Sequence, residues 1–136
     1  MPAQPPYILA MVLCDEVHLD PGTGKRTILG TFSTLYARDF PAVVQRLKVY
    51  VAVTDGRDLT SLELLVSDLD GEPIPGLEDR VELDFDDPRT VYEVEFFLEG
   101  ITFPVPGEVR FHLLSDGESV MERSLKMVAI EEVDRG

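Results

Sequence analysis

The sequence predicts an all-β fold, an antiparallel β-sandwich of seven to nine strands. Turn signals recur at short intervals, and the runs between them are rich in Val, Ile, Leu, Phe and Tyr. Several runs alternate apolar and polar residues, as antiparallel strands with one solvated face do. All ten prolines fall at the start of the chain or between the predicted strands. So many half-apolar strands need two facing sheets to cover them.

The length and composition fit one domain. With 136 residues, 44% of them hydrophobic, the chain has apolar material for one core. We therefore expect a single domain over residues 1–136, with a flexible N-terminus at 1–6 and a polar tail at 131–136.

The first two runs predict a hairpin. Residues 7–19 form the first run, residues 26–36 form the second, and a Pro- and Gly-containing loop joins them. Gly30 interrupts the second run, which predicts a bulge or a close approach of another group. The stretch 7–14 is nearly continuously apolar, so a buried helix remains an alternative there.

The middle of the chain predicts two core strands after an irregular segment. Residues 37–46 break the alternation and predict a single helical turn or a crossing loop. Two alternating strands then follow at 47–54 and 60–69. Their inward residues are Leu47, Val49, Val51 and Val53 in the first and Leu62, Leu64 and Val66 in the second.

The rest of the chain predicts four more strands and two connections. Residues 72–76 carry two prolines and predict a connection, because proline lacks the backbone donor that a central strand needs. Residues 100–107 likewise predict a connection or an edge piece. The strands around them have inward sets Val81, Leu83 and Phe85; Tyr92, Val94, Phe96 and Leu98; and Val109, Phe111 and Leu113. The turn Asp116-Gly117 leads into a last strand at 118–130.

Two stretches carry a family resemblance. The stretch Phe103-Pro104-Val105-Pro106-Gly107-Glu108-Val109-Arg110-Phe111-His112-Leu113, followed by Asp116-Gly117-Glu118, resembles the last hairpin of bacterial immunoglobulin-like sandwiches. The opening Cys14-Asp15-Glu16-Val17, with Thr23-Gly24-Lys25 and Leu29-Gly30-Thr31-Phe32, is similar to a family of small bacterial domains of unknown function. The resemblance implies an immunoglobulin-like fold and no assigned activity.

The charge balance excludes some partners. The formal net charge is −14, and the sequence pI is near 4.3. Phosphate backbones and anionic membranes bind clusters of Lys and Arg, so we expect neither nucleic acid nor a membrane as a partner. Cys14 is the single cysteine, which excludes an intrachain disulfide. The apolar run at 7–14 is too short to span a bilayer, and we expect a cytoplasmic protein.

Catalytic and metal signatures receive no support from the sequence. Cys14, Glu16 and His18 alternate along the first run, but in a strand the first and last lie on the order of 14 Å apart. A nucleophile and its base need hydrogen-bond contact. The run Asp68-Leu69-Asp70-Gly71 resembles a calcium loop only faintly and is typical of a β-turn. We therefore predict no enzyme, no cofactor and no metal site.

The acidic residues predict one candidate interaction face. Residues 68–99 hold twelve carboxylates against two arginines, a local net charge of −10. If their two strands are neighbours, like charges face one another, which costs stability unless a basic partner or a divalent cation meets them. Phe97 stands out among them, since a solvated face gains little from Phe. The candidate face consists of Glu82, Asp84, Glu93, Glu95, Phe97 and Glu99.

These observations predict a non-enzymatic protein-interaction or assembly module that binds an unknown protein or itself. Two alternatives stay open: a calcium- or polyol-binding module, and an acidic inhibitor that mimics nucleic acid. The second of these requires a continuous acidic stripe.

Overall fold

The computed structural model describes residues 5–131, apart from the side chain of Pro75, and these residues form nine β-strands. The strands are β1 (Tyr7–Leu19), β2 (Arg26–Thr31), β3 (Thr34–Ala37), β4 (Ala42–Thr54), β5 (Asp58–Asp68), β6 (Pro73–Phe85), β7 (Tyr92–Phe103), β8 (Gly107–Ser115) and β9 (Glu118–Ala129).

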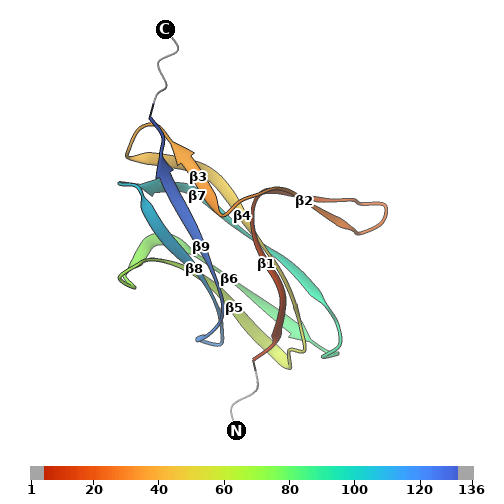
Figure 1. Ribbon diagram of the computed structural model, residues 1–136. Helices are drawn as coiled ribbons and strands as arrows, with labels where there is room; N and C mark the ends of the chain where they lie inside the picture. The colour runs from red at the N-terminus through yellow and green to blue at the C-terminus, as the bar shows by residue number, and fades with distance from the viewer. Residues whose placement is uncertain (1–4, 132–136) are drawn as a thin grey trace.

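The strands form two sheets that face each other (Figure 1). The four-stranded sheet has the order β2-β1-β4-β7, and the five-stranded sheet has the order β3-β9-β8-β5-β6. All pairs are antiparallel except β3 with β9, which is parallel. The sequence-based expectation of a wholly antiparallel sandwich therefore fails at this pair, because the chain crosses from one sheet to the other within two residues, between β2 and β3.

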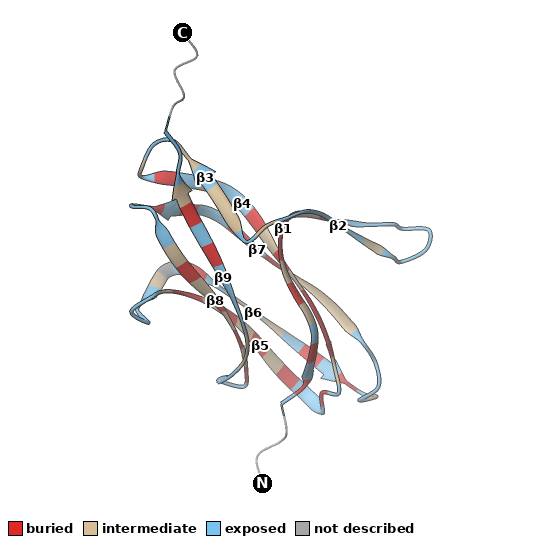
Figure 2. Cartoon of the chain, in the orientation of Figure 1, coloured by how far each residue is buried: buried red, intermediate tan, exposed pale blue. Residues whose placement is uncertain are grey.

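The core lies between the two sheets and takes side chains from both (Figure 2). The inward sets predicted for β4, β5 and β8 are all buried. A strand with period two places alternate side chains on opposite faces, so an apolar residue at every second position is enough to define the buried face. The rule is less sharp at Val81, Tyr92 and Val94, which are partly buried and pack against the core.

The first predicted hairpin is confirmed for β1 and β2, but the second predicted run, 26–36, is divided. β2 ends at Thr31, and Thr34–Ala37 form β3 in the other sheet. Residues 7–14 are part of β1, not a helix, and β1 pairs antiparallel with β2. Gly30 has a φ of 68°, and a Cβ there would lie 2.3 Å from the Asp15 carboxylate. A glycine is therefore required at this position both by the backbone conformation and by the close approach of Asp15.

Three connecting segments differ from the prediction. Residues 37–46 contain no helical turn, and β4 begins within them, at Ala42. Residues 72–76 open β6 instead of only connecting; β6 is an edge strand, where proline costs no ladder hydrogen bond. The segment at 100–107 is likewise partly strand, because β7 continues through Phe103. At Gly100, whose φ is 63°, the buried side of β7 changes from even-numbered to odd-numbered residues.

Residues 1–4 and 132–136 lie outside the described residues, while Pro6 is buried just before β1 and Glu131 is exposed. Between residues 5 and 131, no helix has the length and apolar character needed to cross a membrane.

Candidate functional site

The structure divides the predicted acidic face between the two sheets. Glu82 and Asp84 lie on β6, at the edge of the five-stranded sheet. Glu93, Glu95, Phe97 and Glu99 lie on β7, at the edge of the four-stranded sheet. The two strands do touch, since Tyr92 Oη donates to the Asp84 carbonyl oxygen at 2.6 Å. They are nevertheless not paired, so the expected stacking of like charges across a strand pair does not occur.

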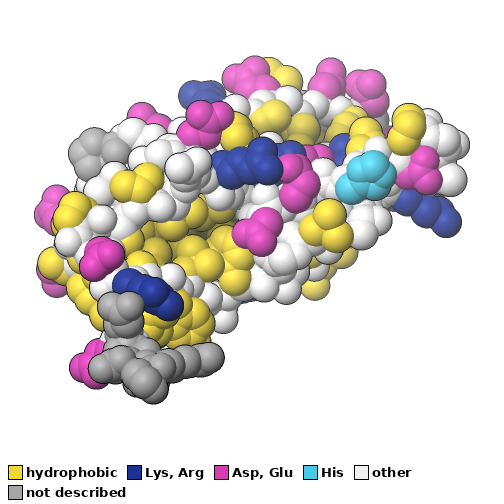
Figure 3. All heavy atoms as spheres, turned by 90° about the horizontal axis from the view of Figure 1, so that it is seen from above, with side chains coloured by type: hydrophobic (Ala, Val, Ile, Leu, Met, Phe, Trp, Pro, Cys, Tyr) yellow, Lys and Arg dark blue, Asp and Glu magenta, His cyan; other side chains and the backbone are white. Residues whose placement is uncertain are grey.

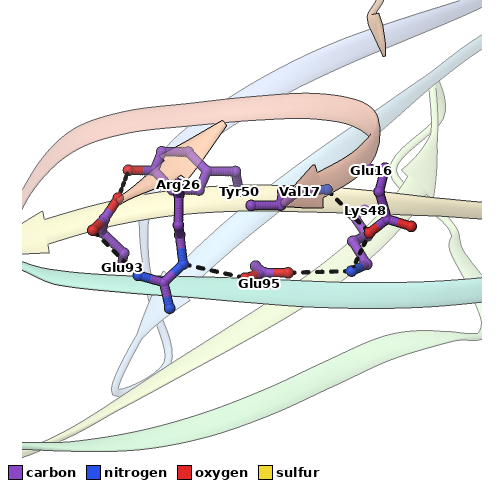
Figure 4. Close-up of polar contacts among 7 residues, drawn as sticks. All are labelled: Glu16, Val17, Arg26, Lys48, Tyr50, Glu93 and Glu95. Atoms are coloured by element: carbon purple, nitrogen blue, oxygen red, sulfur yellow. Dashed lines mark hydrogen bonds and ion pairs between the residues drawn. The ribbon is translucent and has the colours of Figure 1, made fainter. Parts of the chain in front are cut away.

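On the outer face of the four-stranded sheet, the carboxylates of β7 are paired with cations from other strands (Figure 4). The Arg26 guanidinium lies 3.2 Å from Glu93 Oε1 through Nη1 and 3.2 Å from Glu95 Oε2 through Nε. The three side chains are 23–32% exposed. Half-buried, charge-assisted hydrogen bonds of this kind are stronger than those of fully solvated pairs.

Lys48 continues this row of ion pairs. Its Nζ lies 3.2 Å from Glu95 Oε1 and 2.5 Å from Glu16 Oε1. The hydrogen bond with Glu16 raises the pKa of Lys48, and the same bond lowers the pKa of Glu16. The Val17 backbone N–H also donates to Glu16 Oε1 at 3.1 Å. The carboxylate of Glu16 is thus held by two donors, the Lys48 ammonium and the Val17 N–H.

Tyr50 closes the row at its other end. Its hydroxyl donates to Glu93 Oε2. Partial burial, together with this hydrogen bond to a carboxylate, raises the pKa of Tyr50 to about 12. We call the six connected side chains the paired-charge row; they are Glu16, Arg26, Lys48, Tyr50, Glu93 and Glu95.

The path of β1 explains how Arg26 reaches this face. β1 pairs with β4 from Tyr7 to Cys14 and with β2 from Cys14 to Leu19. The second half of β1 therefore leaves the sheet together with β2, and Figure 1 shows the resulting hairpin extending from the body of the molecule. Arg26 opens β2, and its ion pairs tie this hairpin to β7 at the opposite edge of the sheet.

Phe97 lies at the Lys48 end of the paired-charge row. It is the direct cross-strand partner of Lys48 and is 41% exposed. A shallow depression of about 320 Å³ is lined by Phe97 together with Glu16, Arg46, Lys48 and Glu95. The phenyl ring is therefore presented to solvent within a ring of charged side chains, as the sequence predicts, but that ring includes cations.

The cysteine and the histidine of the first strand do not form a site. Cys14 is fully buried, and burial and the neighbouring Asp15 carboxylate both raise the pKa of its thiol. His18 is exposed on the hairpin, and Glu16 belongs to the paired-charge row. Within residues 5–131, no group of three or more His, Cys, Asp or Glu side chains is arranged to hold a metal ion.

The segment that resembles a calcium loop forms a turn. Asp68 Oδ1 accepts hydrogen bonds from the backbone N–H groups of Asp70 and Glu72, both at 2.9 Å. The Gly71 N–H donates to the Asp68 carbonyl oxygen at 3.1 Å. The Asp68 carboxylate therefore stabilises the turn between β5 and β6.

Sequence reasoning missed the cations of this face. Lys48 follows from the alternation of β4, because it stands between the inward residues Leu47 and Val49 and must point outward. Arg26 gave no such signal, since its contact with β7 joins residues 67 and 69 positions apart in the chain. Seen from above, Asp and Glu side chains are spread among hydrophobic side chains and among Lys and Arg (Figure 3).

Comparison with known proteins gives a family and little else. A search of curated proteins found no match. Among solved structures, the chain is similar to the Pseudomonas fluorescens alkylpurine DNA glycosylase AlkC bound to DNA containing an abasic site analog. The identity is 8%, the TM-score is 0.47, and the match covers 88% of this chain but 30% of that protein. This chain thus matches less than a third of the glycosylase chain.

The model of a family of unknown function, DUF6941, matches residues 9–128. That range begins near the start of β1 and ends one residue before the end of β9, so it takes in both sheets and the paired-charge row. The chain belongs to this family of unknown function, DUF6941.

Proposed function

We propose that this protein is a protein-interaction module whose binding face is the outer surface of the four-stranded sheet around Phe97. The observation that carries the proposal is an exposed phenyl ring beside charged side chains that are already paired with one another. Binding energy at protein interfaces concentrates in a few anchors, often aromatic, surrounded by polar contacts that exclude water. Phe97 and its charged surroundings fit that arrangement.

The paired charges change the kind of partner that we expect. An unpaired acidic face attracts a basic partner, whereas Glu93 and Glu95 are already neutralised by Arg26 and Lys48. The side chains are also held in place before a partner arrives, which lowers the entropy lost on binding. The partner we infer has an apolar pocket or side chain for Phe97 and a polar rim.

The strand order supports an immunoglobulin-like classification of the fold. In immunoglobulin domains one sheet contains strands A, B and E side by side, and the other contains G, F and C, with C′ added in some. Here β1-β4-β7 follows the first order and β9-β8-β5-β6 follows the second. The strand order thus supports the immunoglobulin-like fold that the sequence resemblance implies. Such modules serve many functions, and the face around Phe97 is the basis of the proposal, not the fold.

The two alternative functions have less support. Mimicry of nucleic acid requires a continuous acidic stripe, and cations interrupt the carboxylates of this face. Calcium binding at residues 68–71 requires carboxylate oxygens that are free to coordinate, whereas Asp68 Oδ1 already accepts two backbone hydrogen bonds.

The proposal is tested by photo-crosslinking in cells that express the protein. A photoreactive phenylalanine derivative is placed at position 97 and, as a matched control, at Leu59, which is 63% exposed on the other sheet. We expect a discrete adduct from position 97 and none from position 59. An adduct with a second copy of this chain would assign the face to self-association.

The crosslinked partner is then purified and its affinity measured. Phe97→Ala is expected to weaken binding about tenfold or more, the effect of losing an aromatic anchor, and Leu59→Ala is expected to leave binding unchanged. Equal affinities for both variants, with far-UV circular dichroism unchanged, would exclude this face as the binding surface.

A further inference from the structure

A second cluster, on the outer face of the five-stranded sheet, aligns a hydroxyl, an imidazole and a carboxylate. Ser67 Oγ of β5 lies 2.7 Å from His112 Nε2 of β8. His112 Nδ1 lies 3.5 Å from Glu122 Oε2 of β9. This is the order in which a serine nucleophile, its general base and an orienting carboxylate are arranged in hydrolases. Sequence analysis does not predict such a pair, because Ser67 and His112 are 45 positions apart in the chain.

The two partners of the imidazole favour the tautomer that nucleophilic attack needs. An ionised carboxylate only accepts hydrogen bonds, so Glu122 favours the imidazole form with its proton on Nδ1. The Nε2 lone pair then faces the Ser67 hydroxyl. The Nδ1 to Oε2 separation is 3.5 Å, an ion-pair distance. Such contacts are often long in structures without substrate and shorten on binding.

All three side chains stand on paired strands, which hold them in register. His112 and Glu122 are direct cross-strand partners. Ser67 is two residues beyond Leu65, the partner of His112 on β5, and so lies diagonally next to the imidazole. Direct and diagonal neighbours on one face of a sheet are within side-chain reach.

An irregularity in β6 opens the space beside Ser67. The pairing of β5 with β6 runs to Leu65 with Glu78 and resumes at Ser67 with Pro73. One residue of β5 thus faces residues 74–77 of β6, and this bulge interrupts the ladder beside Ser67. A cavity of about 220 Å³ results, lined by Ser67 and His112 with Asp68, Leu69, Pro73 and Arg110. Ser67 is only 7% exposed, so the cavity is its route to a substrate.

Arg110 provides a cation at the same place. It is the direct cross-strand partner of Ser67. Its Nε is buried and makes no hydrogen bond among the described residues, while lying 3.7 Å from Glu122 Oε1. The Arg110 side chain is 44% exposed, but its buried Nε lies on the strand next to the nucleophile. A guanidinium there is suited to stabilise the oxyanion that forms when a carbonyl is attacked.

We propose that Ser67 is an activated nucleophile and that this cavity hydrolyses small carboxylic esters. Ser67 Oγ bonds to the ester carbonyl carbon while His112 Nε2 takes the hydroxyl proton. The bond from that carbon to the alkoxy oxygen then breaks, and the leaving alcohol takes the proton from His112. Water adds to the acyl-serine by the same route, which releases the carboxylic acid and restores Ser67. The cavity volume limits the acyl group to a few carbon atoms.

The decisive experiment treats the full chain with an alkyl fluorophosphonate, which phosphonylates activated serines with loss of fluoride. We expect a single adduct in the intact mass, mapped to Ser67 by peptide sequencing. Ser67→Ala removes the adduct, and His112→Ala slows its formation roughly a hundredfold, the usual contribution of a general base. The control Ser124→Ala changes a serine on the same face, opposite Arg110, and leaves the rate unchanged.

Glu122 acts through His112 and is tested as a positioning residue. Glu122→Gln is expected to slow phosphonylation, and Glu122→Asp, which keeps the carboxylate, to restore part of the rate. Far-UV circular dichroism of each variant separates a lost site from a lost fold. Absence of an adduct on the wild-type protein, an adduct on another residue, or equal rates for wild type and His112→Ala would each overturn the proposal.

Discussion

Strands β6 and β7 have similar sequence patterns and different surroundings. Both alternate inward apolar residues with outward carboxylates, both are edge strands, and they follow one another in the chain. On β6, Glu82 has one cation near it, Arg80 of the same strand, at 3.5 Å, and the two side chains are 54% and 61% exposed. On β7, Glu93 and Glu95 are half-buried and are held by Arg26 and Lys48.

The difference shows that alternation determines which face a carboxylate is on, but not its electrostatic environment. Charges of opposite sign near the surface interact weakly when solvent surrounds both, and more strongly when neighbouring side chains exclude water. The neighbour of β6 offers no cation at the register positions of Glu82 and Asp84, which face Ser61 and Leu59. The outward carboxylates of β6 therefore fit the protection of an exposed edge against pairing with another chain.

The largest expected effect comes from reversing a charge in the paired-charge row. Lys48→Glu places a third carboxylate between Glu16 and Glu95 and is expected to lower the free energy of unfolding by about 2 kcal/mol. The matched change Arg80→Glu on β6 is expected to cost less than about 0.5 kcal/mol. Urea unfolding of both variants measures the difference.

A second reversal separates charge from packing. If the loss in Lys48→Glu is electrostatic, adding Glu95→Lys restores part of it, because the pair is then remade with opposite orientation. Equal destabilisation by Lys48→Glu and Arg80→Glu would mean that the two strands do not differ electrostatically.

An intermediate loss of stability is expected when the Tyr50 hydroxyl is removed. Its pKa is raised from 10.0 to about 12 in the folded protein, mainly by burial and then by the hydrogen bond to Glu93. A raised pKa means that the contribution to stability is complete below pH 10 and is lost as the pH rises from 10 to about 12. Tyr50→Phe lacks this hydrogen bond, and we expect it to be less stable by roughly 1 kcal/mol below pH 10.

The gap between wild type and Tyr50→Phe should therefore close as the pH rises above 10 and reverse in sign before it reaches about 12. Denaturant midpoints of the two proteins across this range are the measurement, and Tyr36→Phe, an exposed tyrosine of β3, is the control. A gap that stays constant with pH would contradict the raised pKa of Tyr50.

The smallest expected effect on stability is on β6. The double change Glu82→Gln and Asp84→Asn is expected to alter the free energy of unfolding by less than about 0.5 kcal/mol, since both side chains are exposed. The same change at Glu93 and Glu95 should cost more, because it leaves Arg26 and Lys48 without their partners.

The β6 variant should differ instead in association. Removing charge from an edge strand favours edge-to-edge pairing, so light scattering is expected to rise at high concentration. A β6 variant that loses as much stability as the β7 variant would show that the carboxylates of β6 are structurally engaged as well.

Much of the fold was predictable because strand alternation is a local property. The inward set Leu47, Val49, Val51 and Val53 was read from the sequence and is fully buried. Prediction failed at two places. At Gly100, β7 continues but its buried side changes from even-numbered to odd-numbered residues. At β3, the strand pairs parallel with β9. Neither the φ of a glycine nor the choice of a partner strand is specified by the pattern of nearby residues.

The candidate site shows the same division. Alternation with buried residues identified Phe97 and five carboxylates as outward residues; the carboxylates are Glu82, Asp84, Glu93, Glu95 and Glu99. Their separation onto two sheets, and the pairing of Glu93 with Arg26, depend on how strands far apart in the chain are ordered. The contact of Ser67 with His112 likewise follows from the pairing of β5 with β8.

The sequence by itself determined that this protein is built of strands, which residues of most strands are buried, and that its surface is acidic. Those properties follow from side-chain chemistry and from a period of two along the chain. Only the tertiary structure decided which charges are paired, which edge carries free carboxylates, and which hydroxyl meets an imidazole. Those contacts join residues tens of positions apart, and strand order, which is set by packing of the whole core, brings them together.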